Sequence, residues 1–203
     1  MGFYEKRILP HLLNAAMRRP EHLPYRKRVV SQAEGRVLEI GLGAGLNLQF
    51  YTSRATAMIA IEPHPQPVAL AAIKNSPVPV HVVSGSAEAI PLEAAAIDTI
   101  VSTWNLCSIA DAGAALAELR RVLKPGGRLL FVEHGLAPDE TVRRWQTRLN
   151  PLWKRIAGGC NMHRPIPNLI ENAGWEIDHL ESGYMMTGPK VLTFTYEGAA
   201  VPR

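Results

Sequence analysis

The chain has 203 residues, of which 47 % are hydrophobic and 20 % are charged, and this composition excludes disordered, collagen-like and coiled-coil proteins. No apolar run reaches the roughly 18 residues of a membrane span, and two cysteines suit a reducing cytoplasm better than a disulfide framework. The net charge of +4 is uneven: residues 1–36 carry 8 basic and 3 acidic side chains, and residues 139–165 carry 6 and 2. The rest is slightly acidic. We therefore expect a near-neutral core with two basic segments, which argues against a nucleic-acid partner.

Short β-branched runs alternate with helical patterns through the middle of the chain, as is typical of a parallel sheet covered on both faces. The predicted strands are 36–40, 57–61, 79–83, 97–102 and 128–133. The helices predicted between them are 45–52, 66–74 and 111–122. Asp111 is the expected N-cap of the last of these helices, which ends at a Lys-Pro-Gly-Gly turn.

The pattern changes after the fifth strand. Residues 139–157 predict a helix that Pro151 kinks or splits. Its apolar stripe comprises Trp145, Leu149, Leu152, Trp153 and Ile156. A short helix at 167–173 and two strands at 175–180 and 190–197 complete the chain, so the sequence predicts a doubly wound α/β domain with a terminal strand pair.

The most informative stretch is residues 39–45, Glu-Ile-Gly-Leu-Gly-Ala-Gly, which follows a strand and opens a predicted helix. Glycines let the backbone turn sharply against a ligand, and a helix N-terminus offers free N–H groups. Glu62, at the end of the second strand, is placed to accept hydrogen bonds from both hydroxyls of a ribose. These features predict a site for a nucleoside-bearing cofactor. The alternative is a glycine turn that only packs a helix on a strand.

The spacing of the loop narrows the choice of cofactor. It reads E-x-G-x-G-x-G, whereas a dinucleotide-binding loop reads G-x-G-x-x-G. Glu39 repels a pyrophosphate and attracts a cofactor that carries an ammonium and a sulfonium. S-adenosyl-L-methionine carries both groups, and we expect it as the cofactor.

Residues 33–135 resemble the class I S-adenosylmethionine-dependent methyltransferases. The matching motifs are the glycine loop, Glu62, residues 85–91, Asp98, residues 103–106 and residues 123–127. The resemblance implies a Rossmann-like sheet of seven strands whose last strand is antiparallel. It also implies the cofactor-binding residues, which are Glu39, Gly41, Leu42, Gly43, Gly45, Asn47, Glu62, Pro63, Ser86, Ala87, Glu88, Thr103 and Trp104. Ser86 stands where many relatives carry Asp, so the adenine contact falls to the backbone N–H of Ala87.

A narrower resemblance concerns the methyl acceptor. Residues 106–109, 133–135, 158–161 and 189–198 are similar to methyltransferase-like proteins that methylate alkyl thiols and hydrogen sulfide. The resemblance implies S-methylation of a small, apolar thiol, with an acceptor site made of Tyr4, Asn105, Cys107, Cys160 and His163. Phosphatidylethanolamine-type N-methyltransferases and quinone-type C-methyltransferases share the core motifs and remain alternatives. A cofactor-binding regulator without catalysis is a remote one.

His134 is the candidate catalytic residue. It lies just past the fifth strand, at the sheet edge where doubly wound folds place their reacting groups. Positioning supplies most of the acceleration of an in-line methyl transfer, and a thiol with a pKa near 8.5 needs only a modest base. The alternative is a histidine that is satisfied by Glu133 or the backbone. We expect no metal site, because no ligand pair has the required spacing.

The two basic segments allow two interpretations. Their side chains are Arg18, Arg19, Arg26, Lys27, Arg28, Arg143, Arg144, Arg148, Lys154 and Arg155. Either they form solvated faces opposite a core-packed stripe, or they attach a cytoplasmic protein to an anionic bilayer that delivers a lipid or apolar acceptor. We expect a single domain over 1–203, with an N-terminal cap (1–32), a cofactor-binding core (33–135), a helical lid (136–173) and the strand pair (174–203).

Overall fold

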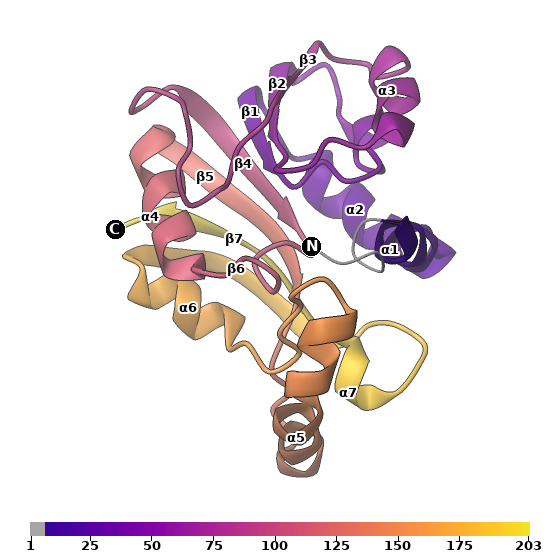
Figure 1. Ribbon diagram of the computed structural model, residues 1–203. Helices are drawn as coiled ribbons and strands as arrows, with labels where there is room; N and C mark the ends of the chain where they lie inside the picture. The colour runs from indigo at the N-terminus through magenta and orange to yellow at the C-terminus, as the bar shows by residue number, and fades with distance from the viewer. Residues whose placement is uncertain (1–6) are drawn as a thin grey trace.

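The computed structural model describes residues 7–203, which form one mixed sheet of seven strands with helices on both faces (Figure 1). The elements are α1 (Leu9–Met17), η2 (Pro20–His22), α2 (Leu23–Val30), β1 (Gly35–Ile40), η3 (Leu48–Phe50), β2 (Ala55–Ile61), α3 (Pro67–Lys74), β3 (Val80–Val83), β4 (Ile97–Thr103), α4 (Ala112–Val122), β5 (Leu123–His134), α5 (Glu140–Ile156), α6 (Ile166–Asn172), β6 (Trp175–Tyr184), α7 (Lys190–Thr193) and β7 (Phe194–Pro202). The strand order is β3-β2-β1-β4-β5-β7-β6, and β7 is antiparallel to both of its neighbours. The predicted fold class is confirmed.

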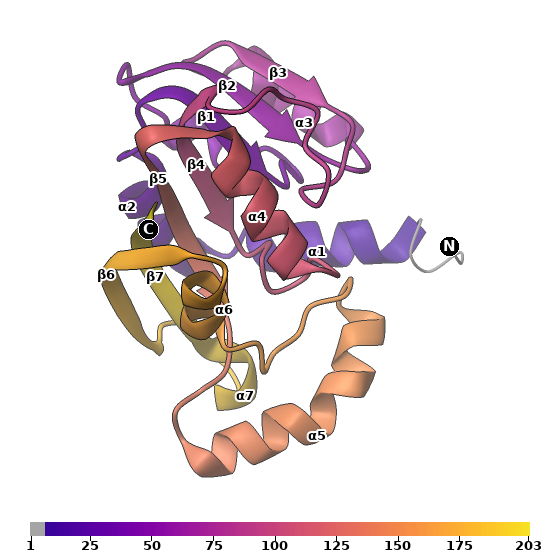
Figure 2. The same ribbon diagram turned by 90° about the vertical axis from the view of Figure 1, so that its left-hand side faces the viewer.

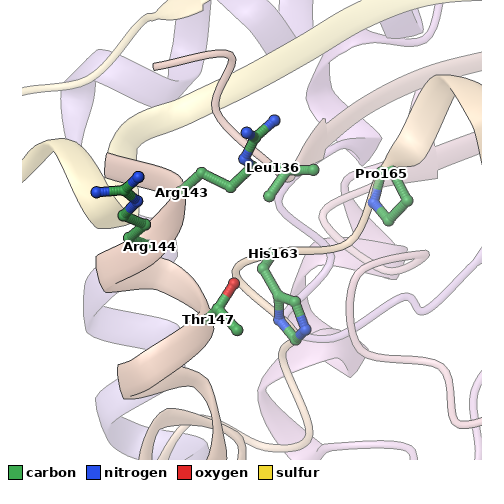
Figure 3. Close-up of a pocket in the computed structure, with 6 residues that line it drawn as sticks. All are labelled: Leu136, Arg143, Arg144, Thr147, His163 and Pro165. Carbon is green, nitrogen blue, oxygen red and sulfur yellow. The ribbon is translucent and has the colours of Figure 1, made fainter. Parts of the chain in front are cut away.

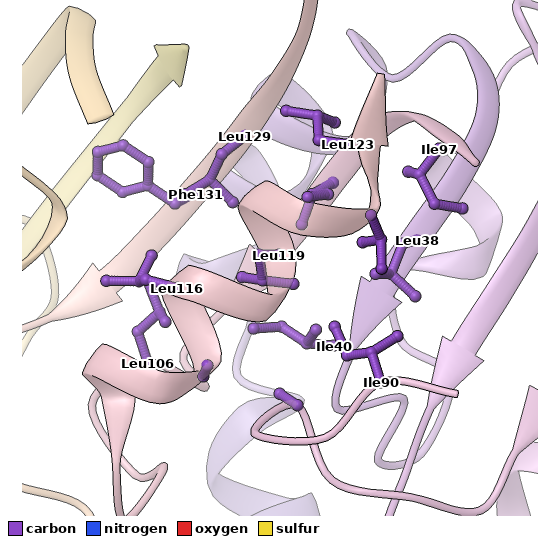
Figure 4. Packing of buried hydrophobic residues seen from close by; sticks show 14 of the residues in the cluster. Leu38, Ile40, Ile90, Ile97, Leu106, Leu116, Leu119, Leu123, Leu129 and Phe131 are labelled. Atoms are coloured by element: carbon purple, nitrogen blue, oxygen red, sulfur yellow. The ribbon is translucent and has the colours of Figure 1, made fainter. Parts of the chain in front are cut away.

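The sheet separates two apolar layers, because successive side chains of a strand point to opposite faces. In β2, Ile59 and Ile61 face the layer of α4 and α6, while Met58 and Ala60 face the layer of α2 and α3. Figure 4 shows the first layer, in which α4 packs on strands β1 and β5. Asp111 caps α4 as predicted, its Oδ1 accepting a hydrogen bond from the Ala114 N–H at 2.9 Å.

The strand order positions the functional site. The chain runs outward from β1 through β2 to β3, and then returns to the other side of β1 with β4 and β5. The order therefore reverses between β1 and β4, and ligands of doubly wound folds bind outside the carboxyl ends of the strands at such a point. The segments that follow β1 and β4 begin at Gly41 and Trp104.

Several predicted elements differ from the structure. The strand expected at 128–133 begins at Leu123, so the expected Lys-Pro-Gly-Gly turn lies within β5. The helix expected at 45–52 is only the short turn η3, because the buried Asn47 side chain bonds to Glu39 and Thr103. Side chains that bond the surrounding framework compete with regular helix formation. The strand expected at 190–197 begins with the helical turn α7 and becomes extended only from Phe194.

Helix α5 is the largest departure from expectation. It is continuous across Pro151 and bends along its length (Figure 2), as an internal proline favours. The expected core-packed stripe is wrong: Trp145 is 52 % exposed and Leu152 is 61 % exposed. The buried side of α5 instead consists of Val142, Gln146 and Asn150.

Candidate functional site

The loop after β1 is shaped by three glycines in the left-handed region, with φ values of 73° at Gly41, 53° at Gly43 and 73° at Gly45. A Cβ on Gly41 would lie 2.0 Å from Oδ1 of Asn105, so the loop packs directly on the segment after β4. A Cβ on Gly43 would meet no atom of residues 7–203 within 4 Å, so this part of the backbone borders open space in the described structure. The loop thus offers backbone to a ligand at the point where the strand order reverses.

Glu62 joins the end of β2 to this loop. Its Oε2 accepts a hydrogen bond from the Gly43 N–H at 2.9 Å, and its Oε1 accepts one from the His64 N–H at 3.1 Å. The side chain is half-buried, so the carboxylate keeps a solvent-facing side. Pro63, beside it, is exposed.

Glu39 lies beneath the loop and is 1 % exposed. Its Oε1 accepts a hydrogen bond from Asn47 Nδ2 at 3.0 Å, and its Oε2 accepts one from the Tyr51 hydroxyl at 2.6 Å. Burial raises the pKa of Glu39 to about 7, against the opposing effects of these two bonds and of the Arg26 charge. The carboxylate therefore holds the floor of the site.

Arg26 reaches this floor from α2. Its Nη1 donates to Asn47 Oδ1 at 2.6 Å and to Thr103 Oγ1 at 3.3 Å, and burial lowers its pKa to about 10. The guanidinium also lies over the Trp104 ring, 4.9 Å from its centroid. Arg26 is 4 % exposed, so its assignment to a basic surface is wrong.

Trp104 occupies a conformation that is rare for a bulky residue, with φ at 54°. His22 of η2 packs edge-on against its ring at 4.8 Å between centroids. The indole Nε1 is buried without a hydrogen-bond partner. The N-terminal helices therefore cover the end of β4 and hold this tryptophan in place.

The turn after β3 contains the residues predicted to contact adenine. The Ser86 hydroxyl donates to Glu88 Oε2 at 2.7 Å, and Glu88 Oε1 accepts from the Asp111 N–H at 2.7 Å. This backbone bond is the main cause of the lowered pKa of Glu88. Ala87, between them, is buried. The turn is thus fixed to the start of α4.

Glu133 organises the carboxyl edge of β4 and β5. It is fully buried, and Oε1 accepts from the Ser102 hydroxyl at 2.6 Å and from the Asn105 N–H at 3.0 Å, while Oε2 accepts from the Cys107 N–H at 3.2 Å. Burial raises its pKa. Sequence reasoning considered Glu133 only as a partner for His134, although neighbouring side chains of a strand point to opposite faces.

His134 and the two cysteines lie together at this edge. His134 Nδ1 is 3.6 Å from Cys160 Sγ, which is 3.8 Å from Cys107 Sγ. The opposite ring nitrogen of His134, Nε2, is buried and has no hydrogen-bond partner among residues 7–203. The structure therefore brings together three of the predicted acceptor-side residues and leaves one imidazole nitrogen available.

His163 lies elsewhere, in a groove of about 550 Å³ beside α5 (Figure 3). The groove is lined by Leu136, Arg143, Arg144, Thr147, His163 and Pro165. Burial lowers the pKa of His163. Tyr4, the remaining predicted acceptor residue, lies outside the described residues.

Asp98 lies at the opposite ends of the strands, near the start of β4. Its Oδ1 accepts from Lys124 Nζ at 2.8 Å, and its Oδ2 accepts from the Arg36 N–H at 2.8 Å. It therefore ties β4 to the starts of β1 and β5. Within residues 7–203, no three His, Cys, Asp or Glu side chains are grouped as metal ligands. In the same range, every helix is too short or too polar to span a bilayer.

Comparison with known proteins agrees with this geometry. A family profile described as "Methyltransferase domain" matches residues 38–131. The chain is 34 % identical over 149 residues to human "Thiol S-methyltransferase TMT1B", covering 70 % of this chain and 61 % of that protein. It is 29 % identical over 155 residues to human "Thiol S-methyltransferase TMT1A", covering 72 % and 63 %. The chain thus spans less than two thirds of the length of these relatives.

A solved structure shares the fold. It is the 1,6-didemethyltoxoflavin-N1-methyltransferase of Burkholderia thailandensis with bound S-adenosylhomocysteine, which is 13 % identical and has a TM-score of 0.70 over 95 % of this chain and 82 % of that one. Sheet topology, loop position and sequence profile therefore agree with the prediction from sequence. Over residues 38–131 the chain matches the methyltransferase-domain family, and its sheet has the strand order of the class I S-adenosylmethionine-dependent methyltransferases, whose cofactor is S-adenosyl-L-methionine.

Proposed function

We propose that this protein transfers a methyl group from S-adenosyl-L-methionine to the sulfur of a small, apolar thiol. The observation that carries the proposal is the buried Nε2 of His134 at the carboxyl edge of the sheet, which finds no hydrogen-bond partner in the described part of the chain. A buried polar atom without a partner is rare in proteins, and a bound acceptor would satisfy it. The names of the thiol S-methyltransferase relatives support the choice of acceptor.

The residues around the glycine loop fit the cofactor. Open space at Gly43 leaves room for a ligand against the backbone, and the partly solvent-facing Glu62 suits the ribose hydroxyls. The turn at 86–88 suits the adenine, and the buried negative charge of Glu39 favours a cationic ligand nearby. The cofactor supplies an electrophilic methyl group, so the protein has to position the acceptor, exclude water and remove one proton.

His134 is suited to remove that proton. Its Nδ1 faces the Cys160 thiol, which leaves Nε2 to accept the proton of the acceptor thiol. The thiolate would then be the nucleophile for the methyl group that bound S-adenosyl-L-methionine supplies, with a methyl thioether and S-adenosylhomocysteine as products. The proton is returned to solvent.

Labelled cofactor and a panel of acceptors test the proposal. We expect methyl transfer to small alkyl thiols. The rate of this transfer at neutral pH should fall at least tenfold in His134→Gln, because a general base typically contributes more than that to a reaction rate. His81→Gln on the exposed part of β3 is the matched control. Preferential transfer to phosphatidylethanolamine vesicles or to a quinone would establish one of the alternatives instead.

We propose in addition that α5 contacts an anionic membrane surface. Trp145, Leu149 and Leu152 form an exposed apolar stripe, and Arg148 stacks on the Trp145 ring at 5.8 Å. An apolar stripe beside basic side chains is the pattern of helices that lie in a bilayer interface. Arg144 and Arg155 add positive charge to the exposed surface of the same helix.

Co-sedimentation with phosphatidylglycerol-containing vesicles tests this contact. We expect binding that weakens with salt and is reduced by Leu152→Glu. Leu70→Glu on α3 is the matched control, because both leucines are 61 % exposed. Equal binding of the two variants, or no binding by the native protein, would contradict the membrane contact.

A further inference from the structure

We propose that Cys107 and Cys160 form a reversible disulfide when the protein meets a small oxidised thiol, and that this bond shuts the acceptor site. The two thiols are 3.8 Å apart, Sγ to Sγ. They belong to different parts of the fold, since Cys107 follows β4 and Cys160 follows α5. A bond between them would fasten the lid to the sheet edge.

The backbone already holds the two residues side by side. The Asn161 N–H donates to the carbonyl of Cys107 at 2.8 Å. Asn161 is itself held by Asn150 of α5, whose Nδ2 donates to Asn161 Oδ1 at 3.2 Å. A Cβ on Gly159 would lie 3.1 Å from the Ser108 carbonyl oxygen, so the segment after α5 and the segment after β4 are in close contact here.

Only a small movement separates the thiols from a covalent bond. A disulfide has a sulfur–sulfur distance of about 2 Å, so the sulfurs must approach by about 2 Å. Rotation about the Cα–Cβ bond of a cysteine moves its sulfur by a distance of this order. The fold therefore presents a pair poised for oxidation.

The surroundings make the two thiols unequal. The shared hydrogen bond, together with His134 Nδ1 at 3.6 Å, lowers the pKa of Cys160. The same hydrogen bond and burial raise the pKa of Cys107. Cys160 is also the more accessible of the two. Because the thiolate is the attacking species in exchange, Cys160 is the first to react.

The exchange proceeds in two steps. The Cys160 thiolate attacks one sulfur of a small disulfide, forms a mixed disulfide and releases one thiolate. The Cys107 thiol then loses its proton and attacks Cys160 Sγ, which releases the second thiolate. Both released thiolates take up protons, so two cysteine thiols are oxidised while one disulfide is reduced to two thiols.

The consequence for activity rests on the proposed function. If the acceptor is a small thiol, its oxidised form is a small disulfide of similar shape that reaches the same residues. Oxidation would then remove Cys160 from His134 and fix residues 158–161 against the end of β4. We expect an oxidised acceptor pool to turn methyl transfer off, and a reductant to restore it.

Mass spectrometry of the full chain tests the bond directly. The protein is treated with hydroxyethyl disulfide, denatured and alkylated with N-ethylmaleimide. The sequence contains only two cysteines, so an internal disulfide leaves a protein lighter by two hydrogens with no alkylated site. Two mixed disulfides, two alkylated thiols or a dimer on a non-reducing gel would each overturn the proposal. No cofactor or acceptor is needed, so the result is independent of the proposed function.

Activity measurements then test the switch. Oxidation should lower thiol methylation by the native protein at least tenfold, and dithiothreitol should restore it. The variants Cys107→Ala and Cys160→Ala cannot form the internal disulfide. The activity of each oxidised variant is compared with the activity of the same variant after reduction, and added reductant should remove any mixed disulfide. Full activity of the internally bonded native protein would overturn the switch while leaving the bond intact.

Discussion

The apolar layers of the sheet and helix α5 are held in place by different interactions. Strand side chains such as Ile59 and Phe131 fix the sheet by burial in apolar layers. Helix α5 instead docks through amides: Gln146 Oε1 accepts from the Ala137 N–H, and its Nε2 donates to the carbonyls of Gly135 and Val191. The comparison shows that the apolar side of an amphipathic helix need not be the side that packs.

This difference has a physical basis. Hydrophobic burial is non-directional, so it secures a layer but does not single out one position along it. Hydrogen bonds to fixed backbone groups require one position and one orientation. A lid that must meet the sheet edge at defined atoms gains more from directional contacts.

The largest effect is expected at the glycine loop. Gly41→Ala places a methyl group within 2.0 Å of Asn105 and strains a left-handed residue, so it should lower the free energy of unfolding by about 3 kcal/mol. Gly43→Ala, which faces open space, should cost only about 1 kcal/mol but abolish S-adenosylhomocysteine binding. Thermal unfolding measures the stability of each variant, and calorimetry measures its affinity for S-adenosylhomocysteine. Equal unfolding temperatures for Gly41→Ala and Gly43→Ala would contradict the prediction that only Gly41 is packed against Asn105.

The next effect concerns how α5 docks. Gln146→Leu removes three hydrogen bonds in a fully buried place, and the unpaired groups should cost about 2–3 kcal/mol. Leu152→Ala, on the exposed stripe, should change stability by less than about 0.5 kcal/mol. Urea unfolding gives the free energy of unfolding of both variants. A larger loss in Leu152→Ala than in Gln146→Leu would contradict docking through the glutamine amide.

A pH dependence follows from Glu39. Its pKa of about 7 in the folded protein is raised above the ordinary value, so its protonated form favours folding. The stability from this group is complete below about pH 4.5 and is lost as the pH rises through 7, amounting to about 3 kcal/mol at most. Unfolding measured from pH 4.5 to 8 should show a smaller decline in Glu39→Gln. Some decline should remain, because burial also raises the pKa of Glu133.

The smallest effect is confined to binding. Glu62→Ala should weaken S-adenosylhomocysteine binding about tenfold, or about 1.4 kcal/mol, with little loss of stability because the side chain is half-buried. Glu93→Ala, an exposed carboxylate, serves as the control. Unchanged affinity in Glu62→Ala would mean that the ribose lies elsewhere.

Sequence reasoning succeeded where local patterns determine structure. Alternating strands, the Asp111 cap and the glycine spacing located the sheet and the loop, because each depends on near neighbours in the chain. The network around Arg26 was missed, since its partners Asn47 and Thr103 are distant in sequence. The stripe of α5 was misassigned because helical periodicity identifies an apolar side without showing what that side faces. Its docking depends on Gln146, whose partners lie in two separate segments, the loop after β5 and helix α7.

The reach of Arg26 from α2 to Thr103 also bears on the order in which the protein is assembled. On the ribosome α2 emerges before β4, so the groups that Arg26 contacts are complete only after Thr103 has been added. Until β4 has been synthesised, Arg26 therefore remains charged and hydrated, without the Thr103 contact that it makes in the folded protein. Closure of the site floor therefore follows the synthesis of β4, although Arg26, which completes it, precedes Thr103 by 77 residues.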